Sequence, residues 1–394
     1  MSLSSVEIIG FRSIRKLRFP VGRLTVFVGG NGVGKTNLYR SLELLHAAAT
    51  GAFADEIARE GGLGSVFWAG GRNLTADGSF DPRYRTDGFR VDEGNRLQIA
   101  ADFDRIGDTG FSPSYRLEVG FPTADAAAFA LEAQVKAESL VMQSRGRTLP
   151  LMDRKGGAIW GRDADGRRVQ LEEAALASET ALATLRGDQT EVALVRDLLA
   201  TWRFYHGFRT DAASPLRRPA RAITSPMLTS DGSNLAAVFA TLRYIRGDAP
   251  ELDAAIEDAF PGARLVVSEP EEFASFAMLF PETPKRPFQA HELSDGTLQF
   301  LALAGALLSY RLPPFIALNE PETSLHPDLL PALARMIARA AERSQIWVVT
   351  HSRDLAEALA QETGALPRTV IRRDGATWIE GLSQIGTFPD DGDG

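Results

Sequence analysis

Cysteine is absent from the 394 residues of this chain, which excludes disulfides, thiolate metal ligands and a cysteine nucleophile. Histidine is scarce, and its five copies are spread between positions 46 and 351, so no clustered zinc site is indicated. The most apolar stretch, residues 298–308, covers only about half a bilayer span. The first residues also lack the apolar core of a signal peptide. We therefore expect a cytoplasmic protein that has no membrane partner.

Lysine is rare as well, because only five of the 43 basic residues are lysine and the rest are arginine. An arginine-rich stretch therefore carries little information here, whereas each lysine carries more. The net charge of −8 argues against a surface devoted to nucleic acid, although a local basic patch remains compatible with it. With 44% hydrophobic and 24% charged residues, the composition is typical of a globular protein with a sizeable core.

Helix and strand patterns alternate at both ends of the chain. A run of β-branched and apolar residues at 24–28 predicts a strand buried on both faces, and a helical pattern follows at 35–49. Further strands are predicted at 6–10, 16–19, 314–318, 345–350 and 368–372, and helices at 233–246, 250–260, 295–309, 327–343 and 353–362. This alternation predicts an α/β fold whose parallel sheet is assembled from both ends of the chain.

The middle of the chain has a different pattern. Alternating segments between residues 88 and 175 predict short, mostly antiparallel strands, and residues 176–202 look helical. The predicted division is an N-terminal lobe at 1–120, an inserted arm or lid at 121–200 and a C-terminal lobe at 201–394.

Residues Gly29-Gly-Asn-Gly-Val-Gly-Lys-Thr36 match the phosphate-binding pattern G-x-x-x-x-G-K-[ST], with a strand before it and a helix after it. Glycines let backbone N–H groups turn toward phosphate oxygens, and the helix N-terminus favours the anion. Lys35 would neutralise phosphate charge, and Thr36 would offer its hydroxyl to Mg²⁺. The expected cofactors are ATP and Mg²⁺. The residues expected to contact the nucleotide from this segment are Gly29, Asn31, Gly32, Gly34, Lys35, Thr36 and Asn37.

Phe315 to Glu320 forms a buried strand that ends in Asn319 and Glu320. In nucleoside triphosphatases with this loop, such a strand ends in an acid that holds Mg²⁺, and we expect it to lie beside the strand at 24–28. Glu320 would polarise the attacking water as a general base. Asn319 occupies the metal-side position, where an aspartate is expected.

Two further segments open helices. Leu293-Ser-Asp-Gly-Thr297 could hold a phosphate through Ser294 and Gly296, or it could simply cap the helix that follows. His351 ends a third buried strand at the ligand edge of the sheet, where it could be catalytic or could only start a helix.

These segments, in this order, resemble the ABC-type ATPases of the RecF/SMC class, in particular stand-alone ATPases of the AAA_21 type that are related to the head of OLD-family proteins. The resemblance identifies 29–36 as Walker A, 293–297 as the signature, 315–320 as Walker B, 324–327 as the D-loop and His351 as the switch histidine. It also places Arg12, of Phe11-Arg12-Ser13, near the nucleotide. The stretches 319–327 and 230–235 are particularly specific to the group. The likeness covers residues 1–50 and 200–375 well. No glutamine stands near 65–68, where the Q-loop is expected.

The resemblance implies a P-loop fold and a molecular switch that forms a homodimer on ATP binding. Ser294 and Gly296 of one subunit would contact the γ-phosphate that Lys35 of the other holds, with Glu320 and His351 acting in hydrolysis. It also suggests DNA as a partner, in repair or anti-phage defence, and a partner protein encoded nearby. The alternative is a nucleotide-binding regulator or scaffold with little ATPase activity, with Asn319 as the reason. A built-in nuclease and a transport ATPase are both disfavoured.

Residues 202–221 mix arginines with aromatic side chains. This mixture could line a nucleic-acid surface. It could equally place the aromatic residues in the core and the arginines on a solvated face, and the acidic total favours this second interpretation.

Overall fold

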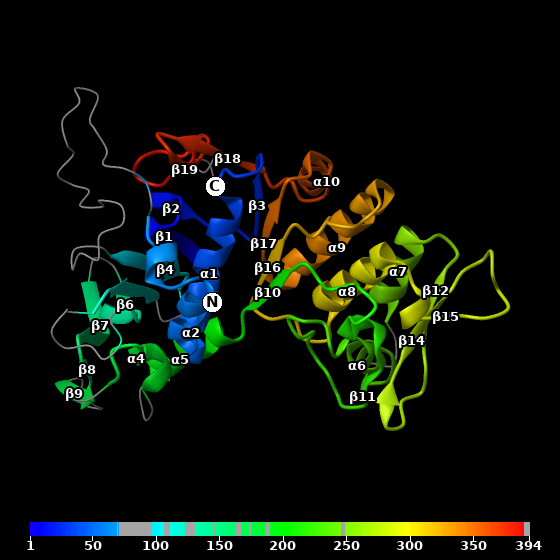
Figure 1. Ribbon diagram of the computed structural model, residues 1–394, viewed down its shortest axis with the longest axis horizontal. Coiled ribbons are helices and arrows are strands. Elements are labelled where there is room, and N and C mark those ends of the chain that lie inside the picture. The colour runs from blue at the N-terminus through cyan, green and yellow to red at the C-terminus, as the bar shows by residue number, and fades with distance from the viewer. Residues whose placement is uncertain are drawn as a thin grey trace. The chain divides into compact units, whose positions relative to one another are not determined.

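The computed structural model describes residues 1–68, 70, 96–105, 111–122, 129, 131–144, 147–162, 167–172, 175–185, 190–245 and 249–389. They divide into two compact units (Figure 1). Unit 1 comprises 1–22, 29–201 and the residues from 369 onward, and unit 2 comprises 23–28 and 202–368. No helix within the described ranges is long and apolar enough to cross a membrane.

Unit 1 is built on an antiparallel sheet of eight strands in the order β2-β1-β4-β5-β6-β7-β8-β9. The strands are β1 (Leu3–Phe11), β2 (Ile14–Pro20), β4 (Leu97–Phe103), β5 (Ser112–Gly120), β6 (Gln134–Ser144), β7 (Arg147–Lys155), β8 (Ala158–Arg162) and β9 (Arg168–Glu172). One sheet therefore continues across residue 120, and the division into three parts stays a prediction. Residues 88–95, where strands were also expected, lie outside the described ranges.

The helices of unit 1 surround α1 (Lys35–Thr50), which contacts α2 (Phe53–Arg59), α4 (Ala181–Thr184) and α5 (Thr190–Ala200). A short α3 (Leu63–Val66) follows α2. The helical pattern at 176–202 thus corresponds to α4 and α5. Near the end of the chain, β18 (Arg368–Arg373) and β19 (Ala376–Ile379) form an antiparallel hairpin, and β19 contacts β2.

Unit 2 contains parallel strands in the order β10-β16-β17-β3. They are β3 (Leu24–Val28), β10 (Arg203–His206), β16 (Phe315–Asn319) and β17 (Gln345–Thr350). The prediction that both ends of the chain build one parallel sheet is confirmed. The expectation that β16 lies beside β3 is wrong, because β17 lies between them. Every residue of β17 is buried, and a strand buried on both faces is suited to an interior position.

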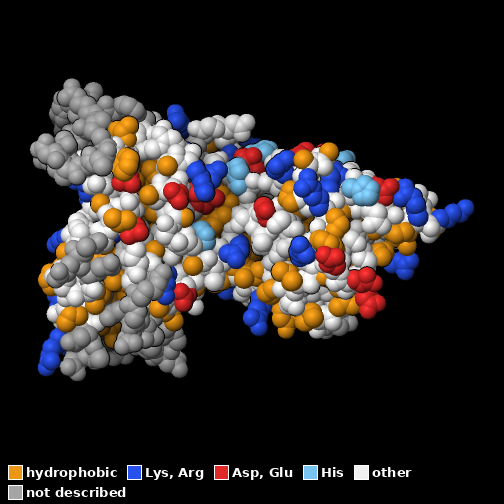
Figure 2. Space-filling model, turned by 60° about the horizontal axis from the view of Figure 1, so that its bottom comes forward, with side chains coloured by type: hydrophobic (Ala, Val, Ile, Leu, Met, Phe, Trp, Pro, Cys, Tyr) orange, Lys and Arg blue, Asp and Glu red, His pale blue; other side chains and the backbone are white. Residues whose placement is uncertain are grey.

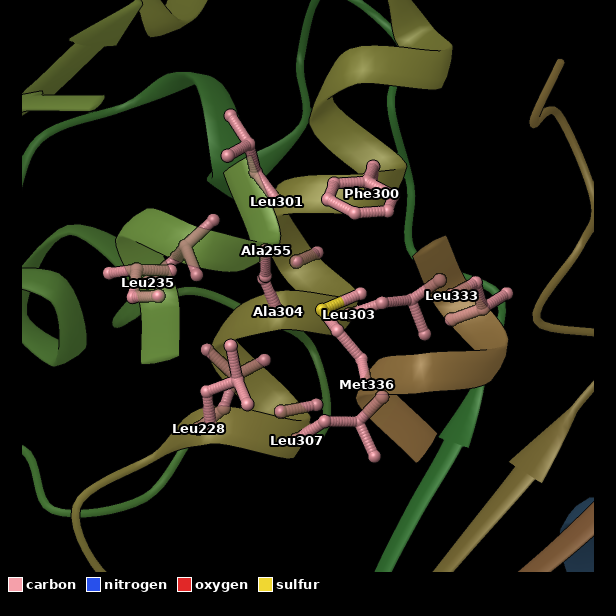
Figure 3. Close-up of a cluster of buried hydrophobic side chains, with 14 of the residues drawn as sticks. Leu228, Leu235, Ala255, Phe300, Leu301, Leu303, Ala304, Leu307, Leu333 and Met336 are labelled. Atoms are coloured by element: carbon pink, nitrogen blue, oxygen red, sulfur yellow. The ribbon is translucent and has the colours of Figure 1, made fainter. Parts of the chain in front are cut away.

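Unit 2 also contains the helices α8 (Asp295–Leu308), α9 (Leu330–Arg343) and α10 (Arg353–Thr363). A further helix, α7 (Pro250–Ala259), contacts α8 and α9. Figure 3 shows how Leu303 of α8 lies against Leu333 and Met336 of α9 in the core. Gly305 leaves no room for a larger residue, because a Cβ there would meet Leu235. The apolar stretch at 298–308 is therefore a core helix.

The remaining elements of unit 2 are short. They are η2 (Pro215–Arg217), β11 (Ala220–Arg221), α6 (Leu235–Ala240), η3 (Thr241–Ile245), β12 (Arg264–Val267), β13 (Phe273–Ala274), β14 (Phe276–Leu279), β15 (Phe288–Gln289), η4 (Ala290–Glu292) and η5 (Pro327–Leu329). The helix expected at 233–246 is thus present as α6 followed by a π-helical turn, η3.

Candidate nucleotide-binding elements

The predicted phosphate-binding loop joins β3 to α1. Gly34 precedes α1 with a φ of 100°, and Gly32 has a φ of 76°, both in the left-handed region that glycine adopts without strain. No side chain caps the N-terminus of α1, and its first turn contains no acid. The loop therefore leaves a helix N-terminus that favours an anion.

Lys35 is 5% exposed and folds back onto this loop. Its Nζ donates to the carbonyl oxygens of Gly29, at 2.7 Å, and Gly30, at 2.8 Å. A buried ammonium needs hydrogen-bond acceptors of this kind, so the two carbonyls stabilise the charge of Lys35 at the N-terminus of α1. The lysine that the sequence singled out is thus part of the loop itself, and its contact with phosphate stays a prediction.

Side chains that lie outside the loop, all of them in unit 1, support it through a hydrogen-bond network. Thr377, on β19, donates to Val33 O at 2.8 Å, and its Oγ1 lies 2.6 Å from Ser13 Oγ. Asn37 donates to the same Ser13 Oγ at 2.6 Å. A Cβ at Gly34 would collide with Thr377 and Ser13, so this glycine is required by packing as well. No sequence pattern pointed to Thr377, because only the tertiary fold brings the hairpin of β18 and β19 to Val33.

Arg12 lies in the turn between β1 and β2 with a φ of 50°. Its guanidinium pairs with Glu60, which also lies 3.5 Å from Arg40. Burial, and then the charge of Arg40, lowers the pKa of Arg12. The proposed contact of Arg12 with nucleotide stays a prediction.

The carboxyl end of the parallel sheet in unit 2 brings Glu320 and His351 together. Glu320 follows β16 with a φ of 49°, and its N–H donates to Val349 O on β17 at 2.7 Å. His351 follows β17, and its Nδ1 lies 3.8 Å from Glu320 Oε1. Both side chains are well exposed, with 37% and 48% of their surface accessible. The sequence placed each at a strand end, and the fold makes them neighbours.

Asn319 is 4% exposed and belongs to the same sheet edge. Its Nδ2 lies 2.7 Å from Nδ1 of His206, the residue that pairs with it on β10. Its Oδ1 is buried without a hydrogen-bond partner among the described residues. An amide oxygen is a ligand that Mg²⁺ accepts, directly or through water, so the residue present fits such an ion. Within the described ranges no group of three or more acidic or histidine side chains could hold a metal by itself.

Glu322 connects the two strand ends. It is buried, and its Oε1 accepts from Thr350 Oγ1 at 2.5 Å and from the backbone N–H groups of His351 and Ser352, both at 3.1 Å. The same oxygen lies 3.4 Å from His351 Nδ1. One carboxylate therefore fixes the segment that carries His351 relative to the segment that carries Glu320. Glu322 was not among the predicted site residues, although it lies within the specific stretch 319–327.

The predicted signature opens α8. Ser294 is its N-cap, and its Oγ accepts from Thr297 N at 3.2 Å, so the capping interpretation is confirmed. A Cβ at Gly296 would lie 2.8 Å from Ser324 O in the predicted D-loop. Gly296 is therefore needed for the close approach of these two segments. A phosphate contact from Ser294 and Gly296 stays a prediction.

The aromatic residues at 202–208 belong to the core: Trp202, Phe204, Tyr205 and Phe208 are all at most 9% exposed. This confirms that the aromatic residues belong to the core, as the favoured interpretation expected, whereas Arg217 is largely buried rather than on a solvated face. On the face shown in Figure 2, acidic side chains lie among the basic ones. Three arginines of the segment 202–221 form ion pairs: Arg209 with Asp211 at 2.9 Å, Arg217 with Asp295 at 2.7 Å and Arg221 with Glu272 at 3.5 Å.

Comparison with protein families gives two matches. Residues 195–356 match the family described as "AAA domain, putative AbiEii toxin, Type IV TA system", and residues 1–56 match "Protein of unknown function (DUF2813)". A search of curated proteins found no match.

Solved structures of SMC heads resemble the whole chain. The SMC head bound to the C-winged helix domain of ScpA is 16% identical, with 98% of this chain and 99% of that chain covered and a TM-score of 0.56. The head with an extended coiled coil bound to the C-terminal domain of ScpA, from Pyrococcus furiosus, is 15% identical over 97% and 96%, with a TM-score of 0.52. The head with a coiled coil and joint from Pyrococcus yayanosii is 12% identical over 97% of each chain, with a TM-score of 0.51. The likeness shows the fold: the chain has the fold of the SMC head domains.

Proposed function

We propose that this chain, whose fold is that of the RecF/SMC-class ATPase heads, binds ATP with Mg²⁺, hydrolyses it, and pairs head to head with a second copy while ATP is bound. The observation that carries the proposal is the loop at 29–36, which combines an uncapped helix N-terminus with the buried ammonium of Lys35, held by the loop's own carbonyls. A triphosphate is the ligand for which such a loop is built.

Most of the predicted site residues have a defined role in this proposal. Backbone N–H groups of the loop, from Gly29 to Gly34, hold phosphate oxygens, and Lys35 neutralises their charge. The family resemblance implies that Thr36 and Asn319 would each offer an oxygen toward Mg²⁺, which when bound would offset the charge that develops on the phosphates. Glu320 orients the attacking water, and His351, 3.8 Å away, holds it by a second hydrogen bond.

The signature of one copy would close the site of the other. Ser294 Oγ and the N-terminus of α8 offer donors to a γ-phosphate. ATP then binds the paired state better than the open state, and hydrolysis removes the contact that favours pairing. DNA, a role in repair or anti-phage defence, and a protein encoded nearby are further parts of the proposal that the family resemblance supports.

Light scattering of a Glu320→Gln variant tests the pairing. With Mg-ATP we expect a dimer, because hydrolysis is blocked, and without nucleotide we expect a monomer. The control is Glu320→Gln combined with Lys35→Ala, which loses nucleotide and should stay monomeric. A Glu320→Gln protein that binds ATP but remains monomeric up to about 50 μM, a concentration at which a specific interface is occupied, would contradict the proposal.

A second candidate is a nucleotide-dependent regulator that hydrolyses ATP very slowly. Asn319 favours it, because a neutral amide attracts Mg²⁺ less than a carboxylate does. Turnover of the unaltered protein with Mg²⁺, with and without DNA, separates the two candidates. Nucleotide binding and pairing without measurable turnover would favour the regulator.

A further inference from the structure

Arg217 of η2 is anchored on the loop that leads into α8. Its side chain is 12% exposed. Nη1 donates to His291 O at 3.0 Å and to Leu293 O at 2.8 Å, and Nη2 donates to Asp295 Oδ1 at 2.7 Å. Nε donates to Thr210 O at 2.9 Å, which fixes the other side of the guanidinium. The planar guanidinium of Arg217 therefore binds both the backbone of the predicted signature and the carboxylate of Asp295 within it.

Asp295 gives this contact an electrostatic consequence. It is the first residue of α8 and stands between Ser294 and Gly296, with its side chain 60% exposed. A carboxylate in the first helical turn is favourable for the helix, but it repels any phosphate that approaches the same N–H groups. Arg217 offsets this negative charge at 2.7 Å.

The segment 230–235, for which the sequence indicated no role, packs against the residue that precedes Arg217. Leu216, the residue before Arg217, is 1% exposed, and a Cβ at Gly232 would lie 2.6 Å from Leu216 Cδ2. Ser214 caps η2 by accepting from Leu216 N at 3.1 Å. The turn that carries Arg217 is therefore packed and capped, so its side chain starts from a fixed position.

We infer that Arg217 is the positioning residue of the signature: it orders the backbone at 291–295 and neutralises Asp295, so that Ser294 and Gly296 can receive the γ-phosphate of a nucleotide held by a second copy of the chain. This inference rests on the proposed function. It argues against a nucleic-acid contact of Arg217, because the side chain is only 12% exposed and four of its N–H groups already donate to residues of its own chain.

The first test measures pairing in the Glu320→Gln background. Arg217→Ala should weaken ATP-dependent dimerisation about tenfold or more, since a symmetric dimer loses the contact at two sites. ATP binding to the separate subunit should be unchanged, because the loop at 29–36 is untouched. The matched control is Arg218→Ala, an exposed arginine next in sequence. Equal dimerisation of the two variants would overturn the inference.

Three further variants separate the neutralisation of Asp295 from the ordering of the backbone at 291–295. Asp295→Asn alone should dimerise at least as well as the parent, and in the Arg217→Ala background it should restore part of the lost pairing. Arg217→Lys keeps the charge but not the fork, and should fall between parent and Arg217→Ala. Asp295→Asn weakening the dimer as strongly as Arg217→Ala would refute the electrostatic role.

Hydrogen exchange measured without nucleotide distinguishes a failure of this inference from a failure of the proposed function. Arg217→Ala should speed exchange of the amides at 294–298, where Arg218→Ala should not. Unchanged exchange there would overturn the inference by itself. A parent that binds ATP yet never dimerises would instead overturn the proposed function, whatever the exchange shows.

Discussion

Replacement of Glu322 should destabilise unit 2 far more than the same replacement two residues earlier. Glu322 Oε1 accepts three hydrogen bonds, from Thr350 Oγ1, His351 N and Ser352 N. Ser352 N has a second acceptor in Thr350 Oγ1 at 2.9 Å, so it is not left without a partner. Glu322→Ala therefore leaves two donors unpaired.

Hydrogen bonds to a charged acceptor contribute about 1.5–3 kcal/mol each, so we expect Glu322→Ala to lower the free energy of unfolding by about 3 kcal/mol. Glu322→Gln keeps one acceptor oxygen but loses the charge. It also puts an NH₂ group where Oε2 is buried without a partner among the described residues. We expect about 2 kcal/mol for this variant.

The matched control is Glu320→Gln, since that side chain is 37% exposed and its loss should cost less than about 0.5 kcal/mol. Urea denaturation gives the free energies, and hydrogen exchange at β16, β17 and α10 locates the change. In the Glu322 variants the amides of His351 and Ser352 should exchange faster than in the control. Equal stabilities for Glu322→Gln and Glu320→Gln would refute the assignment of Glu322 as the link between the two strand ends.

Two other variants test the site. Asn319→Asp adds a negative charge at the metal-side position, so half-maximal ATPase activity should need less Mg²⁺ than in the parent. If the magnesium titrations of the two proteins superimpose, Asn319 does not weaken the dependence of activity on Mg²⁺. Thr377→Val removes the hydrogen bond to Val33 O and should weaken ATP binding severalfold, as calorimetry can measure. Thr369→Val, on the neighbouring strand of the hairpin, is its control, and equal affinities in the two would show that the loop needs no such support.

The sequence by itself determined the local elements that carry the chemistry. Glycine spacing and one of five lysines located the loop at 29–36, because glycines at these positions let backbone N–H groups turn toward phosphate. Buried apolar runs located β3, β16 and β17, since strands covered on both faces are continuously hydrophobic. Glu320 and His351 followed from the same rule, because each comes directly after one of these runs.

Only the tertiary structure decided which of these elements are neighbours. β17 lies between β3 and β16, and β10, a strand that the pattern at 202–206 did not reveal, brings His206 to Asn319. Thr377 reaches residue 33 across more than 300 residues of sequence, and Arg217 reaches Asp295 across 78. Such contacts leave no periodicity in the chain, because they depend on how whole elements pack rather than on the residues within one element.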